Sequence, residues 1–133
     1  MTQEDKELLL KDLCARLPYG LKVKCEKYSF PVTILYGSNI DEVKFKETGG
    51  IENICTIKPY LFPLSSMTDK QKNEYNRLLT DVPTYQYEYG DIVTVIESYD
   101  NWRSIDYLNA NHFDYRYLIE YGLAIDATNL NIY

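Results

Sequence analysis

The chain has 133 residues, of which 45% are hydrophobic and 26% charged, with a formal net charge of -6. This length and apolar content predict one folded domain over residues 1–133 and exclude a disordered chain. No apolar run approaches the roughly 20 residues that span a bilayer, and no signal-peptide pattern opens the chain, so we expect a soluble cytoplasmic protein without a membrane partner.

The first 64 residues predict a helix followed by a β-rich segment. A capping-box pattern at Thr2 and leucines at four-residue spacing indicate an amphipathic helix, which Pro18 and Gly20 end. Alternating or β-branched apolar residues, separated by short turns, then predict four strands at 21–25, 32–36, 43–45 and 51–57. Short turns favour an antiparallel meander, which could also curl into a small barrel.

Residues 65–133 predict mainly helix. The preceding segment, 58–64, holds two prolines among large apolar side chains, so we expect it to be extended and to lie across the core. Apolar spacing and capping residues predict helices at 68–79, 102–108 and 114–121, the last ended by Gly122. Residues 91–96 favour a strand over a helix. The predicted fold class is α+β, with an N-terminal helix, a four-stranded antiparallel meander and C-terminal helices packed on it.

Charge and tyrosine are concentrated in the last two-fifths of the chain. Residues 81–133 contain nine acidic residues, no lysine and only two arginines, Arg103 and Arg116, whereas residues 1–58 balance nine acids with nine bases. Nine of the 14 tyrosines also lie in residues 81–133. A field of one sign repels nucleic-acid phosphates and attracts basic partners, so this half predicts a protein-binding surface.

The preferred position of this surface is a row of alternating tyrosines and its neighbouring acids. Tyrosine offers rigid apolar area with a polar tip, and it is enriched at interaction surfaces. The candidate partner surface consists of Tyr85, Tyr87, Glu88, Tyr89 and Asp91. The alternative interpretation for the tyrosines expected on helices is that they belong to the core, with their hydroxyls at the surface; these are Tyr107, Tyr117 and Tyr121.

A second candidate surface is a lysine-lined face of the predicted sheet, which could bind nucleic acid. If the first and third strands are neighbours, one face carries Lys22, Lys24, Lys44 and Lys46. The nearest aromatic residues are expected outside this stripe, and acidic residues interrupt it. The alternative is the ordinary solvated face of an antiparallel sheet.

No motif predicts catalysis, a metal site or a cofactor. The chain lacks phosphate-binding, nucleophile-elbow and calcium-loop patterns, so we expect a non-enzymatic protein without cofactors. The only histidine, His112, could pair with a cysteine as a catalytic dyad, but a hydrogen-bonding structural histidine is favoured. Cys14, Cys25 and Cys55 show no paired spacing, which predicts free thiols in a reducing compartment, buried as small apolar residues.

Four sequence blocks resemble those of a known group of proteins. They are residues 13–20 (LCARLPYG), 57–68 (IKPYLFPLSSMT), 107–116 (YLNANHFDYR) and 118–125 (LIEYGLAI). In the same order they resemble blocks in an uncharacterised family of short proteins from phages and mobile elements of gut anaerobic bacteria. The resemblance covers roughly a third of the chain. It implies an accessory protein acting in a bacterial host cell, and it implies no catalytic residue.

Overall fold

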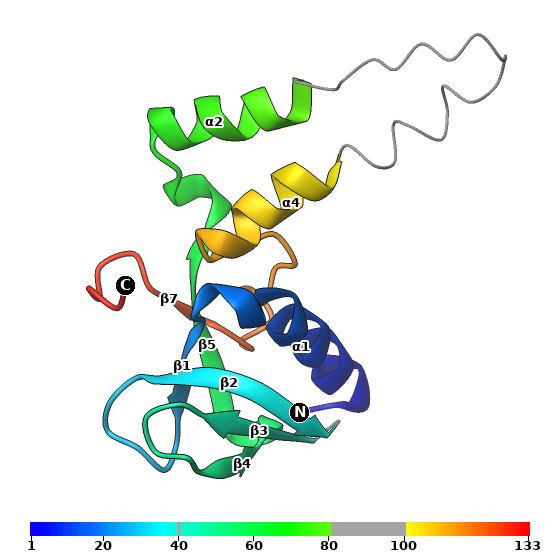
Figure 1. Cartoon of the computed structure of the whole chain (residues 1–133), viewed down its shortest axis with the longest axis vertical. Helices are drawn as coiled ribbons and strands as arrows, with labels where there is room; N and C mark the ends of the chain where they lie inside the picture. The colour runs from blue at the N-terminus through cyan, green and yellow to red at the C-terminus, as the bar shows by residue number, and fades with distance from the viewer. Residues whose placement is uncertain (40, 81–100) are drawn as a thin grey trace, which may run out of the picture.

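The computed structural model describes residues 1–39, 41–80 and 101–133 of the chain. It confirms the predicted α+β class, with an N-terminal helix, an antiparallel meander and C-terminal helices (Figure 1). The elements, in which η marks a short 3-10 helix, are α1 (Gln3–Arg16), η1 (Leu17–Tyr19), β1 (Lys22–Cys25), β2 (Val32–Asn39), β3 (Glu42–Phe45), β4 (Ile51–Asn53), η2 (Ile54–Thr56), β5 (Ile57–Pro63), η3 (Leu64–Ser66), α2 (Asp69–Thr80), α4 (Asn101–Ala110), β6 (Phe113–Asp114) and β7 (Ile125–Asp126).

Helix α1 begins and ends where its local sequence predicts. The Asp5 amide donates to the Thr2 hydroxyl at 3.1 Å, and the Thr2 amide donates to the Asp5 carboxylate at 3.0 Å, which completes a capping box. At the other end, Pro18 lies in η1, and Gly20 follows with a φ of 66°. Glycine adopts this left-handed conformation without strain, so the chain turns there toward the sheet.

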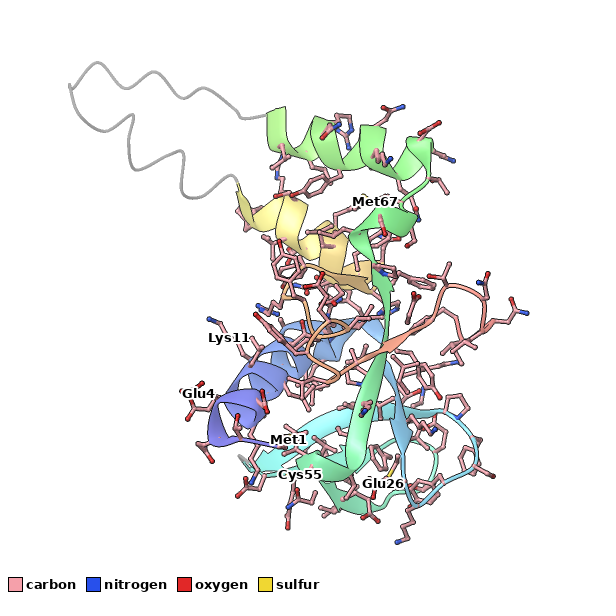
Figure 2. The ribbon with its side chains drawn as sticks, turned by 180° about the vertical axis from the view of Figure 1, so that it is seen from behind. Met1, Glu4, Lys11, Glu26, Cys55 and Met67 are labelled. Atoms are coloured by element: carbon pink, nitrogen blue, oxygen red, sulfur yellow. The ribbon has the colours of Figure 1, made fainter. Side chains whose placement is uncertain are left out.

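The core lies between α1 and the sheet. Leu9 and Leu13 point inward and are buried, whereas Glu4 and Lys11 lie on the outer face of the helix (Figure 2). The strands and the turns beside them complete the core with Leu21, Val23, Cys25, Val32, Ile34, Val43, Phe45, Ile54, Ile57 and Leu61. Each large apolar side chain removed from water contributes about 1.5–3 kcal/mol, so this layer is the main contact between helix and sheet.

Seven strands form one sheet within the described residues, in the order β4-β3-β2-β1-β5-β6, with β7 also paired to β5. Strands β1 to β4 form the predicted antiparallel meander. Strand β1 then pairs antiparallel with β5, and β5 pairs in parallel with β6 and β7. The sheet is open, with β4 at one edge, so the alternative of a closed small barrel is wrong.

The predicted strand at 51–57 is interrupted in the middle. Strand β4 stops at Asn53, whose side-chain oxygen accepts a hydrogen bond from the Cys55 amide at 2.9 Å. The Thr56 hydroxyl donates to the Asn53 carbonyl at 2.7 Å. These local bonds form the turn η2, which takes the chain away from the sheet edge. The next residues, predicted as extended, form β5 beside β1, with Tyr60 and Leu61 buried.

Helices α2 and α4 match the predictions for 68–79 and 102–108, and they lie side by side (Figure 1). The Gln71 amide donates to the Thr68 hydroxyl at 3.2 Å, and the Thr68 amide donates to the Gln71 side-chain oxygen at 2.9 Å, which starts α2. The predicted strand at 91–96 lies outside the described residues.

The predicted helix at 114–121 is wrong. Phe113 and Asp114 pair with β5 as the short strand β6, and the following residues form turns. The Asp114 carboxylate accepts hydrogen bonds from the Leu118 amide at 3.0 Å and the Ile119 amide at 2.9 Å. In a helix these two amides would donate to backbone carbonyl groups, but here they donate to the buried Asp114 side chain. Gly122 has a φ of 73° and ends this turn region instead of a helix.

Candidate functional site

The tyrosine row predicted as the partner surface lies outside the described residues. It comprises Tyr85, Tyr87, Glu88, Tyr89 and Asp91. The assignment of this row to a binding surface stays a prediction. The described residues of the same acidic half contribute to three other features: an exposed tyrosine loop, a buried ion cluster and a polar pocket.

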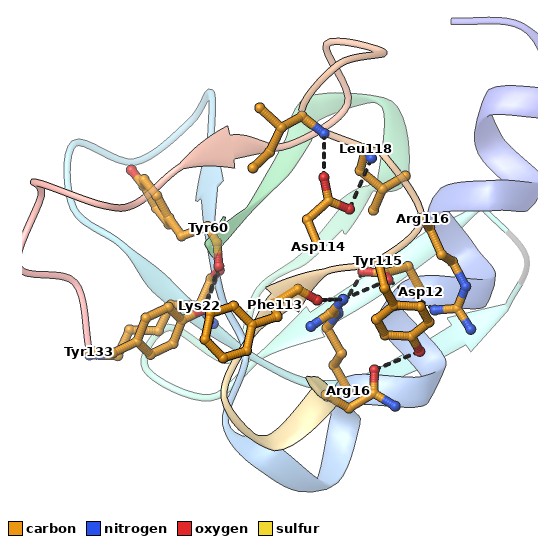
Figure 3. Close-up of polar contacts among 12 residues, drawn as sticks. Asp12, Arg16, Lys22, Tyr60, Phe113, Asp114, Tyr115, Arg116, Leu118 and Tyr133 are labelled. Atoms are coloured by element: carbon orange, nitrogen blue, oxygen red, sulfur yellow. Dashed lines mark hydrogen bonds and ion pairs between the residues drawn. The ribbon is translucent and has the colours of Figure 1, made fainter. Parts of the chain in front are cut away.

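The exposed tyrosine loop is defined here as residues 115–122. Two of its tyrosines, Tyr117 and Tyr121, are 56% and 63% exposed, so the interpretation of both as core residues is wrong; Tyr107 is half-buried. Tyr117 has a φ of 61°, an uncommon conformation for a residue with a side chain. The Asp114 carboxylate beneath the loop holds this backbone in place through the two amides that it bonds (Figure 3).

A hollow of about 240 Å³ adjoins the loop. Its walls come from η3 and the tyrosine loop, and its lining residues are Pro63, Leu64, Ser65, Asp114, Tyr117, Ile119 and Glu120. Leu64 and Glu120 are both exposed. The hollow therefore combines an apolar wall, an exposed aromatic ring and two carboxylates.

The buried ion cluster joins α1 to the segment after α4. Asp12 and Arg16 are both 0% exposed, and the Arg16 guanidinium donates to the Asp12 carboxylate from Nε at 2.8 Å and from Nη2 at 3.1 Å. The same Nη2 donates to the Phe113 carbonyl at 2.6 Å, and Arg116 donates to Asp12 at 2.9 Å (Figure 3). The i,i+4 spacing of Asp12 and Arg16 was visible in the sequence, but such a pair is usually solvent-exposed.

Tyr115 packs on the cluster. Its ring lies 5.3 Å from the Arg16 guanidinium carbon and 4.6 Å from that of Arg116, and its hydroxyl donates to the Asn109 side chain at 2.8 Å. A guanidinium over an aromatic face is electrostatically favourable, most of all where water is excluded. Two arginines share one carboxylate, so the cluster carries one net positive charge beneath the β6 segment.

His112 is 7% exposed, and it stacks on Tyr133 with ring centroids 3.8 Å apart. Its Nδ1 and the Nη1 of Arg16 find no hydrogen-bond partner among the described residues. Burial, and then the positive charge of Arg16, lower the pKa of His112 to about 4, so its ring is neutral at pH 7. His112 is buried and packed, as expected for a structural histidine, but its Nδ1 forms no hydrogen bond among the described residues.

The Tyr133 ring stacks on His112 and is itself fixed by hydrogen bonds of its hydroxyl. Its hydroxyl donates to the Tyr60 carbonyl at 2.8 Å and accepts from the Lys22 amide at 3.0 Å (Figure 3). Burial raises the pKa of this hydroxyl far above its usual range, so Tyr133 stays a neutral phenol. The last residues of the given sequence, 123–133 (the tail), carry no strong pattern, so this role of Tyr133 depends on contacts with distant strands.

His112 and Tyr133 line a pocket of about 450 Å³ between β5, the start of α2 and the C-terminal segment. The other lining residues are Phe62, Ser66, Gln71, Ala110, Asn111, Phe113 and Thr128. The described residues of this lining include no cysteine and no carboxylate, so the pocket does not assemble the Cys–His dyad considered from the sequence.

Three of the four lysines of the alternative surface lie on strands that are not neighbours, and Lys46 directly follows β3. Strand β2 lies between β1 and β3, so the pair Lys22 and Lys24 is separated from Lys44 and Lys46. The Lys22 ammonium donates to the Ile132 carbonyl at 3.0 Å. Lys44 is the cross-strand partner of Tyr36, and its ammonium lies 5.6 Å from that ring, so an aromatic residue does accompany the stripe, contrary to our expectation.

The three cysteines are free thiols, as predicted, but they are not all buried. Cys25 belongs to the core, whereas Cys14 and Cys55 are exposed, the latter at the same end of the sheet as Glu26 (Figure 2). The expectation of burial is therefore wrong for two of them. Among the described residues, no cluster of histidine, cysteine or acidic side chains is suited to hold a metal ion.

Comparisons with known proteins find no match for this chain, whether among family models, curated proteins or solved structures. In the described part of the chain, no helix has the length and apolar character needed to cross a membrane.

Proposed function

We propose that this chain is a non-enzymatic protein-binding module, an accessory protein of a phage or mobile element that acts in the cytoplasm of its bacterial host. Its surface is acidic and tyrosine-rich, and its partner is a protein that presents a basic segment. The observation that supports this proposal best is the hollow beside the tyrosine loop, where the exposed ring of Tyr117 and the exposed Glu120 are both lining residues.

The hollow has the chemistry to bind an arginine or lysine side chain of the partner. The aliphatic stem of such a side chain would pack on Leu64 and Ile119, since both line the hollow. Its cationic head would lie between the ring of Tyr117 and the carboxylate of Glu120. The bonds from Asp114 fix the loop before binding, which lowers the ordering cost of association.

The charge of the surrounding half favours the same partner. Residues 81–133 carry nine acids and two arginines, a balance of -7, and Arg116 is already paired with Asp12. Such a field steers basic partners toward the surface and discourages acidic ones. Rigid tyrosines supply contact area with little loss of side-chain entropy.

The test measures binding of a fluorescent peptide with alternating arginine and glycine by anisotropy at low salt. Glu120→Lys and Tyr117→Ala should each weaken binding about fivefold, since an exposed charge pair or cation–π contact is worth about 1 kcal/mol. Glu4→Lys, on the outer face of α1, makes the same charge change elsewhere and is the matched control. Equal affinities of the Glu120 and Glu4 variants would contradict this surface.

The predicted tyrosine row provides a separate arm of this test. Charge reversal at Glu88 and Asp91 should weaken binding of the same peptide if the row extends the surface. If charge reversal weakens peptide binding only at Glu120, the binding surface is confined to the tyrosine loop and its hollow.

A second candidate function is nucleic-acid binding, because Tyr36 accompanies Lys44 on the sheet. A ring beside a lysine can stack on a base while the ammonium contacts a phosphate. Replacement of Lys22, Lys24, Lys44 and Lys46 by alanine should then weaken binding of single-stranded DNA and reduce its salt dependence. Absence of any binding at low salt would dismiss this function.

A further inference from the structure

A hollow of about 370 Å³ lies beside the strand pair β1 and β5, and residues of η2 and β7 complete its walls. Its charged lining residues are Lys24, Lys58 and Glu26, so its own charge balance is positive. It shares no lining residue with the hollow beside the tyrosine loop, and the acidic last two-fifths of the chain contribute only Ile125 to it. It is therefore a separate candidate site, with a ligand of the opposite sign.

The two lysines of this hollow lie directly opposite each other. Lys24 is the cross-strand partner of Lys58 in the antiparallel pair of β1 and β5. Partners of this kind project from the same face of a sheet, with Cβ atoms about 4.5–5.5 Å apart. Both side chains are exposed, and two like charges in directly opposite positions destabilise a strand pair. The fold thus places two repelling positive charges at one hollow.

Neither of these two ammonium groups is neutralised within the described part of the chain. The lysines that form ion pairs there are Lys6, with Asp41, and Lys27, with Glu52. The Glu26 side chain, the single acid of the lining, forms no ion pair with a described residue either. An anion bound between the two lysines would supply the missing counter-charge and relieve their repulsion.

We propose that this hollow binds a small molecule that carries a phosphate group, held between the ammonium groups of Lys24 and Lys58. A dianion matches two positive charges, and lysine binds phosphate well as a compact charge on a flexible stem. The Glu26 carboxylate opposes this ligand, but the two lysines outnumber it. The Thr56 hydroxyl, also in the lining, already donates to the Asn53 carbonyl, so the site selects by charge.

Cys55 serves as a reporter of occupancy. Its exposed thiol lines the hollow, next to the end of the sheet that carries Glu26 (Figure 2), whereas the exposed Cys14 lies on α1. In a Cys14→Ser variant, the neutral reagent iodoacetamide should alkylate Cys55 alone, because Cys25 is buried. A phosphate group in the hollow would shield this thiol. Alkylation of Cys14 in a Cys55→Ser variant is the matched control.

The test measures the alkylation rate against the concentration of inorganic phosphate, at mildly alkaline pH and at an ionic strength kept constant with sodium chloride. We expect the rate at Cys55 to fall at least threefold and to saturate, with half of the effect at a concentration on the order of 5 mM. The rate at Cys14 should not change. Constant ionic strength matters because salt alone screens the field of exposed charges.

Three charge variants assign the effect to the hollow. Lys24→Gln and Lys58→Gln should each raise the half-maximal phosphate concentration about fivefold, the usual upper value for one exposed charge contact. Glu26→Gln should lower it by up to the same factor, because it removes the opposing carboxylate. Lys11→Gln, on the outer face of α1 (Figure 2), is the matched control and should leave it unchanged. All four side chains are exposed, so these variants should fold.

A ten-residue oligothymidylate separates the two sources of a phosphate group, since Lys24 also belongs to the alternative nucleic-acid surface. If the oligonucleotide shields Cys55 and inorganic phosphate does not, the hollow belongs to that surface and the small-ligand proposal is overturned. An unchanged rate at about 50 mM phosphate, tenfold above the expected constant, would also overturn it. So would shielding that survives the combined replacement of Lys24 and Lys58.

Discussion

Acid should destabilise this protein through one histidine. His112 is buried, it has no hydrogen-bond partner for Nδ1 among the described residues, and Arg16 lies close to it. Burial first, and then the positive charge of Arg16, lower its pKa from 6.5 to about 4 in the folded chain. The unfolded chain therefore takes up the proton first. The stability that this group contributes is complete above about pH 6.5 and is lost as the pH falls toward 4.

The size of the effect follows from the pKa difference. A shift from 6.5 to about 4 corresponds to about 3 kcal/mol in full, at about 1.4 kcal/mol for each pH unit. Between pH 7 and pH 5, linkage predicts a loss of about 2 kcal/mol from His112 alone. This is a large part of the total stability of a small domain.

Urea unfolding at pH 7 and pH 5 measures this loss, and His112→Asn is the comparison variant. Asparagine tolerates the left-handed backbone of this position and does not titrate in the range. All other titratable groups are the same in both proteins. The difference between their two pH dependences of the free energy of unfolding therefore isolates His112. An NMR titration of the untagged protein gives the pKa directly. A histidine midpoint at or above 6.5, or equal pH dependences of both proteins, would refute the reasoning.

Three further predictions concern the buried polar groups and the thiols. Asp12→Ala leaves two arginine side chains without their carboxylate and should lower the free energy of unfolding by about 3–5 kcal/mol in urea titrations. Asp114→Ala removes the acceptor of two backbone amides and should cost about 2 kcal/mol, with faster amide exchange at Leu118. A thiol reagent should modify two cysteines of the native protein, Cys14 and Cys55, and reach Cys25 only after unfolding.

The local sequence determined those elements whose signals lie within a few residues. The capping boxes at Thr2 and Thr68 and the leucine spacing of α1 predicted the start of each helix, because the bonds that form them join residues three apart. Alternation predicted β1 and β3 in the same way, and the free state of the thiols followed from their spacing.

The same kind of signal failed where a side chain competed with the backbone. The pattern at 114–121 is helical, yet the Asp114 carboxylate takes the amides that the helix needs, and β6 pairs with β5. At 51–57 the hydrogen bonds of Asn53 and Thr56 divide an apolar run into two strands. The spacing of apolar residues carries no information on which hydrogen-bond partner a buried polar group will have in the folded chain.

The candidate functional features, among them the pocket and the buried ion cluster, depended on tertiary structure alone. The pocket brings together residues from β5, α2, the end of α4 and the tail, and Arg16 reaches the Phe113 carbonyl 97 residues away. The sequence determined the acidic, lysine-free composition of the last two-fifths of the chain. That composition sets the sign of the charge expected on the partner. Only the fold decided which tyrosines stand in solvent and that His112 is buried beside an arginine, because exposure and pKa depend on groups far apart in the sequence.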